Sequence, residues 1–369
     1  MSLESLVLTA SHFAASDVRD TIYALLYLAN DMHDVVDTSS ASQVQHRFTS
    51  DYSRHPVDIF KDFVRYSIGK SNSLDVLYRH WACWSHLNAR YGYNERLLPS
   101  WIGAAIFGQN RSESRYHIPS DSLLGPVGSQ VYHASHCISF KGQSIPPTID
   151  DTIQLEGMLL GTVDVASVSA VTRGLIRSDW LRTLGWCGTL DGGIDDQLWR
   201  TLVANRDPES KVAPTWYRRA CALALTQLDH LGDLNSEALA ADPSQPSTLI
   251  EYLKRVQNAT AHKKIFRCAS VESEVKKSPT GSQRKVADAI VGLGPEQMTG
   301  EDESLVCILY GSSVPVILSL IDDERLQSGD ICHVKLVGAC YVHGHMEGEI
   351  FASMGEKEFQ GRTMKFSIH

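Results

Sequence analysis

One block near the C-terminus, residues 302–349, constrains the fold of this chain more than any other part. An apolar, β-favouring run over residues 305–310 meets Gly311-Ser312-Ser313, and residues 314–318 then resume the apolar run. This pattern predicts a tight antiparallel hairpin. Pro315 has no amide donor, so we expect it at the start of its strand or on a strand at the edge of the sheet.

A third apolar run, residues 334–341, follows an acidic spacer. Gly338 interrupts this run, at a position where a bulge or a close backbone approach would fit. The C-terminal block therefore predicts a small antiparallel sheet.

The chain has 369 residues, enough for about two domains of roughly 150 residues each. Its 43% hydrophobic and 21% charged content is that of a globular protein. The formal net charge of -9 argues against a nucleic-acid or anionic-membrane surface, which would need clustered Lys and Arg. Glu4 replaces the basic start of a signal peptide, and no apolar run approaches about 20 residues. We therefore expect a cytoplasmic protein that binds neither nucleic acid nor membrane.

Eight cysteines are scattered along the chain without a C-x-x-C pair. In a reducing cytosol they are expected to be small buried hydrophobic residues. They are Cys83, Cys137, Cys187, Cys221, Cys268, Cys307, Cys332 and Cys340.

Helical spacing of apolar residues dominates the first part of the chain. It predicts amphipathic helices over residues 18–29, 55–70 and 73–87, with Pro56 near the start of the second and Gly69 near its end. Strands are expected within residues 131–140 and 152–163. Further helices are predicted from residue 178, over 195–206 and 214–231, and over 249–256, with a linker at 237–246.

The predicted fold class is α+β, with helical N-terminal and middle segments and a C-terminal antiparallel β-sheet. We divide the chain into three parts. Residues 1–150 form a helical segment with an irregular loop region, and residues 151–260 a strand followed by helices. Residues 261–369 form the antiparallel β module, with a polar, mobile insert near 270–285.

Several phrases of the sequence, in order, resemble the fungal heterokaryon-incompatibility (HET) family. They are SDVRDTIYALL at residues 16–26, DYSRHPVDIFKDF at 51–63, LPSW at 98–101, LWRTLVANR at 198–206 and VGACYVHGHMEGE at 337–349. The family's N-terminal core phrases, L-S-Y-x-W-G, W-I-D-A-x-C-I-N-Q and W-L-G, do not occur. In that family the core is the part tied to cell-death signalling, so the resemblance transfers no catalytic residue to this chain.

Two histidine clusters invite a metal hypothesis. On a strand, His343 and His345 would face one side together with Glu347 and Glu349, with Cys332 and Cys340 nearby in sequence. The alternative is a hydrogen-bonded His343 in a structural motif beside a solvent-facing His345. Because standard ligand spacing is absent, we assign no metal and no cofactor.

The second cluster is His133, His136 and Cys137. On a strand its two histidines would point to opposite faces, which disfavours a shared ion.

Arg206 shares a helix face with Trp199 in the predicted helix 195–206, and it could bind a carboxylate or phosphate through its planar fork. We favour an ion pair or carbonyl cap across a domain junction instead. Asp195 and Asp196 are expected to cap that helix. Residues 291–295, VGLGP, lack the third glycine of a phosphate loop and are interpreted as a turn.

No catalytic residue is assigned, because no G-x-S-x-G elbow, Walker sequence or H-E-x-x-H motif occurs. The resemblance implies a non-catalytic recognition or regulatory module in fungal nonself recognition, whose partner would be a core-containing HET-family protein. The alternative is a repurposed secondary-metabolite enzyme, a cyclase or isomerase, with an apolar ligand pocket lined by Trp81, Trp84, Trp180, Trp186 and Trp216. A third possibility is a product whose true start lies upstream of Met1.

Overall fold

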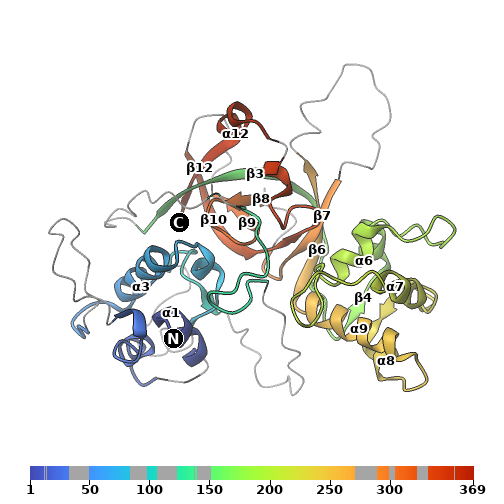
Figure 1. Ribbon diagram of the computed structural model, residues 1–369, viewed down its shortest axis with the longest axis horizontal. Coiled ribbons are helices and arrows are strands. Elements are labelled where there is room, and N and C mark those ends of the chain that lie inside the picture. Colours follow the sequence, from blue (N-terminus) through green and yellow to red (C-terminus); the bar gives the residue numbers. More distant parts are fainter. Residues whose placement is uncertain are drawn as a thin grey trace.

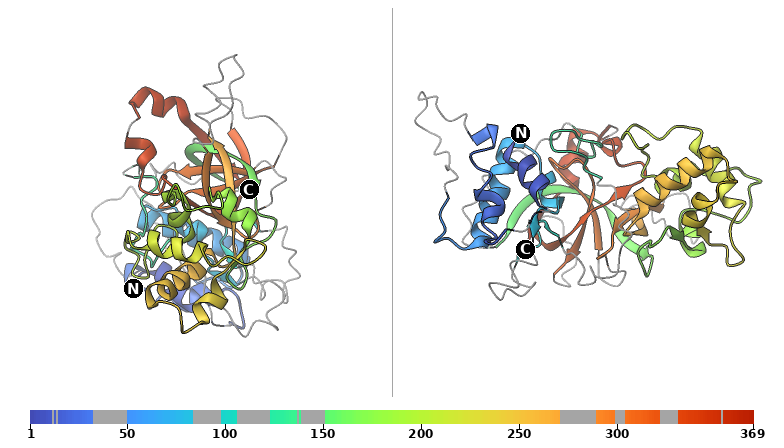
Figure 2. Two further views of the ribbon diagram at one scale, coloured as in Figure 1. Left: turned by 90° about the vertical axis from the view of Figure 1, so that its right-hand side faces the viewer. Right: turned by 90° about the horizontal axis from the view of Figure 1, so that it is seen from below.

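The computed structural model describes residues 1–11, 13, 15–32, 50–83, 98–105, 123–136, 138, 151–270, 289–298, 304–321, 331–352 and 354–369. It has the predicted α+β class. A central sheet is flanked at one end by the N-terminal helices and at the other by the middle helices (Figures 1 and 2). The predicted insert at 270–285 lies outside the described residues except for Ser270, which ends strand β6.

The N-terminal part contains α1 (Leu3–Ala10), α2 (Asp20–Tyr23), the 3-10 turn η1 (Asn30–Met32), α3 (Pro56–Ser71) and the 3-10 turn η2 (Asp75–Tyr78). Helix α3 is predicted correctly, with Pro56 in its first turn. It ends beyond Gly69, where Asn72 adopts a left-handed conformation with φ 51° and caps it.

Two predicted helices in this part are wrong. Over residues 18–29 only α2 is an α-helix, followed by turns, although Ile22, Leu26 and Ala29 are buried as the spacing requires. Within residues 73–83 the chain forms η2 and strand β1 (Ala82–Cys83), which pairs in parallel with β2 (Ala104–Ala105), while residues 84–87 of this predicted helix lie outside the described residues. The ring of Trp81 packs edge-on against Phe63, with centroids 4.7 Å apart, so tertiary packing overrides the local helical period.

The middle helices are α5 (Ser178–Thr183), α6 (Asp196–Leu202), α7 (Tyr217–Leu225), α8 (Ser236–Ala241) and α9 (Ser247–Thr260). A small antiparallel pair, β4 (Leu175–Ile176) with β5 (Leu234–Asn235), accompanies them. The predicted linker at 237–246 is wrong in its first half, because residues 237–241 belong to α8, while residues 242–246 connect α8 to α9. Asn235 caps this helix by accepting a hydrogen bond from the amide of Ala238.

The main sheet contains β3 (Ile153–Ala166), β6 (Lys263–Ser270), β7 (Ala289–Pro295), β8 (Ser304–Leu309), β9 (Val316–Leu320), β10 (Ile331–Ala339), β11 (Tyr341–Val342) and β12 (Thr363–Ile368). The hairpin β8–β9 and the bulge at Gly338 are confirmed, and Pro315 directly precedes its strand. The sheet is not wholly antiparallel, since β10 and β12 run parallel. Helices α11 (Glu349–Ala352) and α12 (Glu356–Arg362) lead into β12.

Two other predictions about strands are wrong. Residues 131–136 and 138 form turns and loops; they are not a strand, and the rest of 131–140 lies outside the described residues. The VGLGP segment is not a turn, because it belongs to β7. There, a Cβ on Gly292 would stand 2.1 Å from the carbonyl oxygen of Tyr341. The glycine thus permits close strand approach.

Pairing closes part of the sheet into a ring: β3 pairs with β12, β12 with β10, β10 with β9, β9 with β8, and β8 again with β3. Cross-strand partners face the same side of a sheet. The registers therefore place one set of buried apolar side chains inside the ring: Leu155, Leu305, Leu309, Leu318, Val334, Leu336, Phe366 and Ile368. The ring interior is filled with apolar side chains.

Candidate functional site

The C-terminal motif, defined as residues 337–349, joins three other segments of the chain. Its strand β11 pairs with β7, and the amide of His343 extends the contact by donating to Val291 O at 3.0 Å. Beyond β11 the chain turns. The amide of His133 donates to Met346 O at 2.9 Å, which fastens the loop at 131–136 to the motif.

Two glycines shape this turn, because Gly344 and Gly348 both have φ 76°. A Cβ on Gly348 would lie 2.5 Å from the Cβ of His136, whereas a Cβ on Gly344 would meet nothing within 4 Å. Gly348 is therefore required both for its backbone conformation and for its packing.

The strand interpretation of residues 343–349 is wrong, because β11 ends at Val342. His345 Nδ1 lies 3.1 Å from His343 O, and Glu349 accepts a hydrogen bond from the amide of Glu347 at 2.8 Å. Burial, with a smaller effect of Arg200, lowers the pKa of His343 and so favours its neutral form.

Within the described part of the chain, no group of three or more His, Cys, Asp or Glu side chains is placed to hold a metal ion. Cys340 is buried and Cys332 lies partly buried on β10. His133 and His136 lie on a loop, where His136 has φ 51° and packs against Gly348, while Cys137 lies outside the described residues.

Arg206, singled out in the sequence, lies at the centre of the junction between the middle helices and the C-terminal motif. Its guanidinium stacks over Tyr132 with Cζ 4.2 Å from the ring centroid, donates to Val131 O at 2.7 Å, and pairs with Glu347. Only 6% of its side chain is exposed. We call these four residues, Val131, Tyr132, Arg206 and Glu347, the Arg206 junction.

The turn before Arg206 is strained. Ala204 and Asn205 both have φ 49°, which costs a non-glycine residue about 1–3 kcal/mol. Ala204 O accepts a hydrogen bond from the hydroxyl of Tyr132, and Arg255 Nε donates to Arg206 O at 2.7 Å. These contacts hold the strained turn in place.

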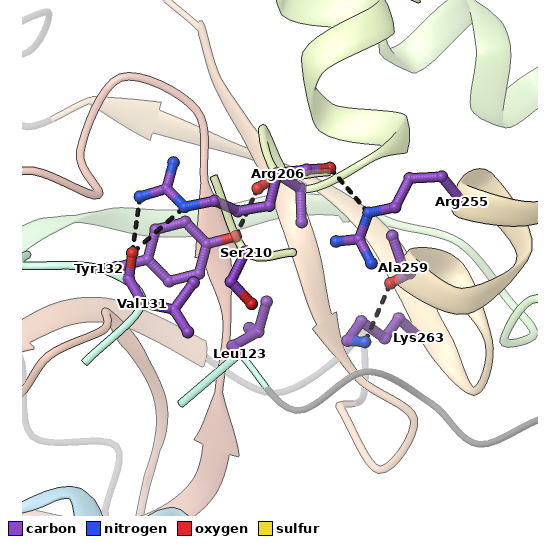
Figure 3. Close-up of a pocket in the computed structure, with 9 residues that line it drawn as sticks. Leu123, Val131, Tyr132, Arg206, Ser210, Arg255, Ala259 and Lys263 are labelled. Carbon is purple, nitrogen blue, oxygen red and sulfur yellow. Dashed lines mark hydrogen bonds between the residues drawn. The ribbon is translucent and has the colours of Figure 1, made fainter. Parts of the chain in front are cut away.

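A small polar cavity of about 20 Å³ adjoins the junction, and Figure 3 shows Arg206, Ser210, Arg255 and Lys263 around it. Burial lowers the pKa of Arg255 to about 10, and burial together with Arg255 lowers that of Lys263 to about 8. Lys263 Nζ donates to Ala259 O at 2.9 Å. The space suits one water molecule.

The start of α6 behaves as predicted. Asp195 caps the helix by accepting from the amide of Gln197 at 3.0 Å, and Asp196 accepts from the indole of Trp199 at 2.9 Å. Arg200 stacks on Trp199 and donates to Asn205. Both Trp199 and Arg200 therefore serve the local structure.

The tryptophans proposed as a ligand-pocket lining belong mostly to the packed core. Trp81 and Trp180 are 1% and 4% exposed, Trp186 and Trp216 pack against the core from its margin, and Trp84 lies outside the described residues. A second hollow of about 210 Å³ is polar, with His345, Glu349, Glu358 and Arg362 on its wall. Drug-sized ligands occupy largely apolar pockets of about 300–1,000 Å³. Neither hollow fits that description.

Sequence reasoning identified Arg206 but missed Tyr132, Arg255 and Lys263. One signal was available for Arg255: it falls between Tyr252 and Ala259 on the apolar stripe of α9, where a charged residue indicates burial with hydrogen-bond partners. Tyr132 carried no such signal, because its contact with Arg206 crosses between distant segments.

Comparison of the chain with protein families, with curated proteins and with solved structures found no match. The resemblance to the HET family rests on the motif phrases and stays a prediction. No described helix is long and apolar enough to span a bilayer.

Proposed function

We propose that the protein is a non-catalytic recognition or regulatory module of the HET type, which binds a core-containing HET-family protein in fungal nonself recognition. One observation carries the proposal. The C-terminal motif, the part with the strongest resemblance, uses its residues for intramolecular contacts: Tyr341 pairs with β7, Glu347 with Arg206, and Gly348 packs on His136. Residues engaged in this way hold the fold together, which supports a recognition or regulatory module over a catalytic one.

The core packing also favours a binding role over the cyclase or isomerase alternative. The enzyme alternative requires an apolar ligand pocket lined by tryptophans. Two of them, Trp81 and Trp180, are instead buried among core side chains. We place the protein in the cytoplasm. Six of the described cysteines are free thiols, which supports a reducing compartment. Cys221, Cys268, Cys307 and Cys340 are buried as expected, whereas Cys187 is exposed, contrary to that expectation.

The test has two parts. Expression of the chain alone in a fungal host is expected to be harmless, and the tagged chain is expected to recover a core-containing HET-family protein under mild conditions. The Gly348→Ala variant, which distorts the motif, should lose the partner, while Gly344→Ala should retain it. Failure of the wild-type chain to recover such a partner contradicts the proposal, and so does toxicity of the chain expressed alone.

A further inference from the structure

Two histidines from separate strands meet on the surface of the sheet. His333 on β10 and His369, directly after β12, have Nδ1 and Nε2 only 2.8 Å apart, with ring centroids 5.1 Å apart. His333 is exposed and His369 is half-buried. Because both rings are accessible from solvent, a small ion can reach the two nitrogens together.

The backbone at both histidines is fixed by the sheet. Strands β10 and β12 pair in parallel, and the amide of His369 donates to Val334 O at 2.9 Å. The amide of Ser100 donates to His369 O at 2.8 Å, and that of Ile321 to His333 O at 3.1 Å. The two imidazoles are therefore presented by a rigid framework, which lowers the entropic cost of joint coordination.

The 2.8 Å between the two nitrogens is the length of a hydrogen bond, and the ring centroids 5.1 Å apart place the nitrogens facing each other. Small rotations of the two rings would turn both lone pairs toward one ion about 2.0 Å from each nitrogen. Cu²⁺ should bind most tightly, since it heads the Irving–Williams order.

We propose that His333 and His369 form a two-histidine surface site for a divalent transition metal ion, with Cu²⁺ preferred over Ni²⁺ and Zn²⁺. The ion takes a lone pair from each ring and replaces the hydrogen bond that now joins them. Since the described residues place no third protein ligand nearby, water completes its coordination. A bound ion would fasten β10 to the end of β12. This site does not depend on the proposed binding function.

The test uses the purified, metal-free full chain in a Cys187→Ser background, because an exposed thiol binds and reduces Cu²⁺. Cu²⁺ alone is titrated, and electron paramagnetic resonance counts the coordinated nitrogens. The expected result is one tight equivalent with two imidazole nitrogens. Ni²⁺ titration by calorimetry gives an affinity free of redox chemistry.

His333→Ala and His369→Ala should each remove one nitrogen from the spectrum. Each should weaken Ni²⁺ binding by more than the roughly 10–100-fold that loss of a merely supporting group causes. Two matched controls, His262→Ala beside Glu296 and His345→Ala in the C-terminal motif, should leave both readouts unchanged. Three results would overturn the proposal. They are a wild-type spectrum with only one coordinated nitrogen, binding by the His333→Ala or His369→Ala variant that equals wild-type binding, and loss of binding in either control variant.

Discussion

Arg206 and Glu347, 141 residues apart in the chain, form an ion pair that joins the segment after α6 to the C-terminal motif. The same guanidinium stacks on Tyr132 and reaches Val131 O through two nitrogens, Nε and Nη2. One buried side chain thus connects three segments that are distant in sequence.

Replacing Arg206 by Ala should lower the free energy of unfolding by about 2–3 kcal/mol. The loss should stay below that for a fully buried pair, because Glu347 is 38% exposed and can be rehydrated. Arg206→Lys should recover only a small part, since an ammonium cannot reproduce the planar fork or the stacking. Urea denaturation measures all three proteins.

The matched control is Arg267, whose ion pair with Asp164 is exposed, with side chains 39% and 41% accessible. Arg267→Ala should change the free energy of unfolding by no more than about 1 kcal/mol. Equal losses for Arg206→Ala and Arg267→Ala would show that the Arg206 junction contributes no more than an ordinary surface pair.

Gly348 and Gly344 offer a comparison in which backbone conformation is constant. Both have φ 76°, so an alanine at either position carries a left-handed penalty of about 1 kcal/mol or somewhat more. Only Gly348→Ala also meets His136, at 2.5 Å, and should lose about 1–3 kcal/mol beyond Gly344→Ala. Thermal and urea denaturation of both variants measure the difference. Equal destabilisation would mean that the loop carrying His136 moves aside without cost.

The sequence predicted the elements whose signals are local. Helix α3 has a proline start and a complete apolar stripe, and the β8–β9 hairpin has two apolar runs around a Gly-Ser-Ser turn. The bulge at Gly338 was signalled by one glycine in a strand. In each case neighbouring residues contain the information that determines the structure.

The elements that failed depend on partners far along the chain. Residues 73–87 have a helical period in the sequence. In the structure, Asp75 accepts a hydrogen bond from the amide of Ser313, and the ring of Trp81 packs on that of Phe63. Strand β12 pairs in parallel with β10, which hairpin signals do not reveal. In the same way Arg206 was recognisable as unusual, but its partners Tyr132 and Glu347 were not, since no local pattern encodes a contact across 141 residues.

The close approach of β7 to β11 gives a third prediction. A Cβ on Gly292 would stand 2.1 Å from Tyr341 O and 2.6 Å from the Phe266 ring, so backbone as well as side chain would have to move. Gly292→Ala should cost about 3 kcal/mol or more and weaken the pairing of β11 with β7. Gly361→Ala in α12 is the control. Its Cβ meets nothing within 4 Å, so it should stabilise the protein by about 0.5–1 kcal/mol. Denaturation and amide hydrogen exchange at Tyr341 measure these effects, and unchanged exchange in Gly292→Ala would contradict the expected loss of pairing.

The last prediction concerns pH. Asp75 is 5% exposed and accepts a hydrogen bond from the amide of Ser313 at 2.9 Å, which ties η2 to the turn after β8. Burial raises its pKa in the folded protein, more than the hydrogen bonds from Ser313 and the charge of Arg79 lower it.

A folded-state pKa above the unfolded value of about 3.9 means that the folded protein holds the proton more tightly. The stability that Asp75 contributes is therefore fully present at pH values below the unfolded pKa, and it is lost as the pH rises through the folded pKa. The Asp75→Asn side chain cannot ionise. As the pH rises through the folded pKa, the wild type should therefore lose stability relative to the Asp75→Asn variant. Asp242→Asn should show the opposite trend, because hydrogen bonds from Ser244 lower the pKa of Asp242. Urea denaturation from about pH 3 to pH 7 measures both differences, because the Asp242 window lies below the unfolded pKa of about 3.9 and the Asp75 window lies above it. If the Asp75→Asn curve ran parallel to that of the wild type, the carboxyl group would have the same proton affinity in the folded and unfolded chains, and burial could not be raising its pKa.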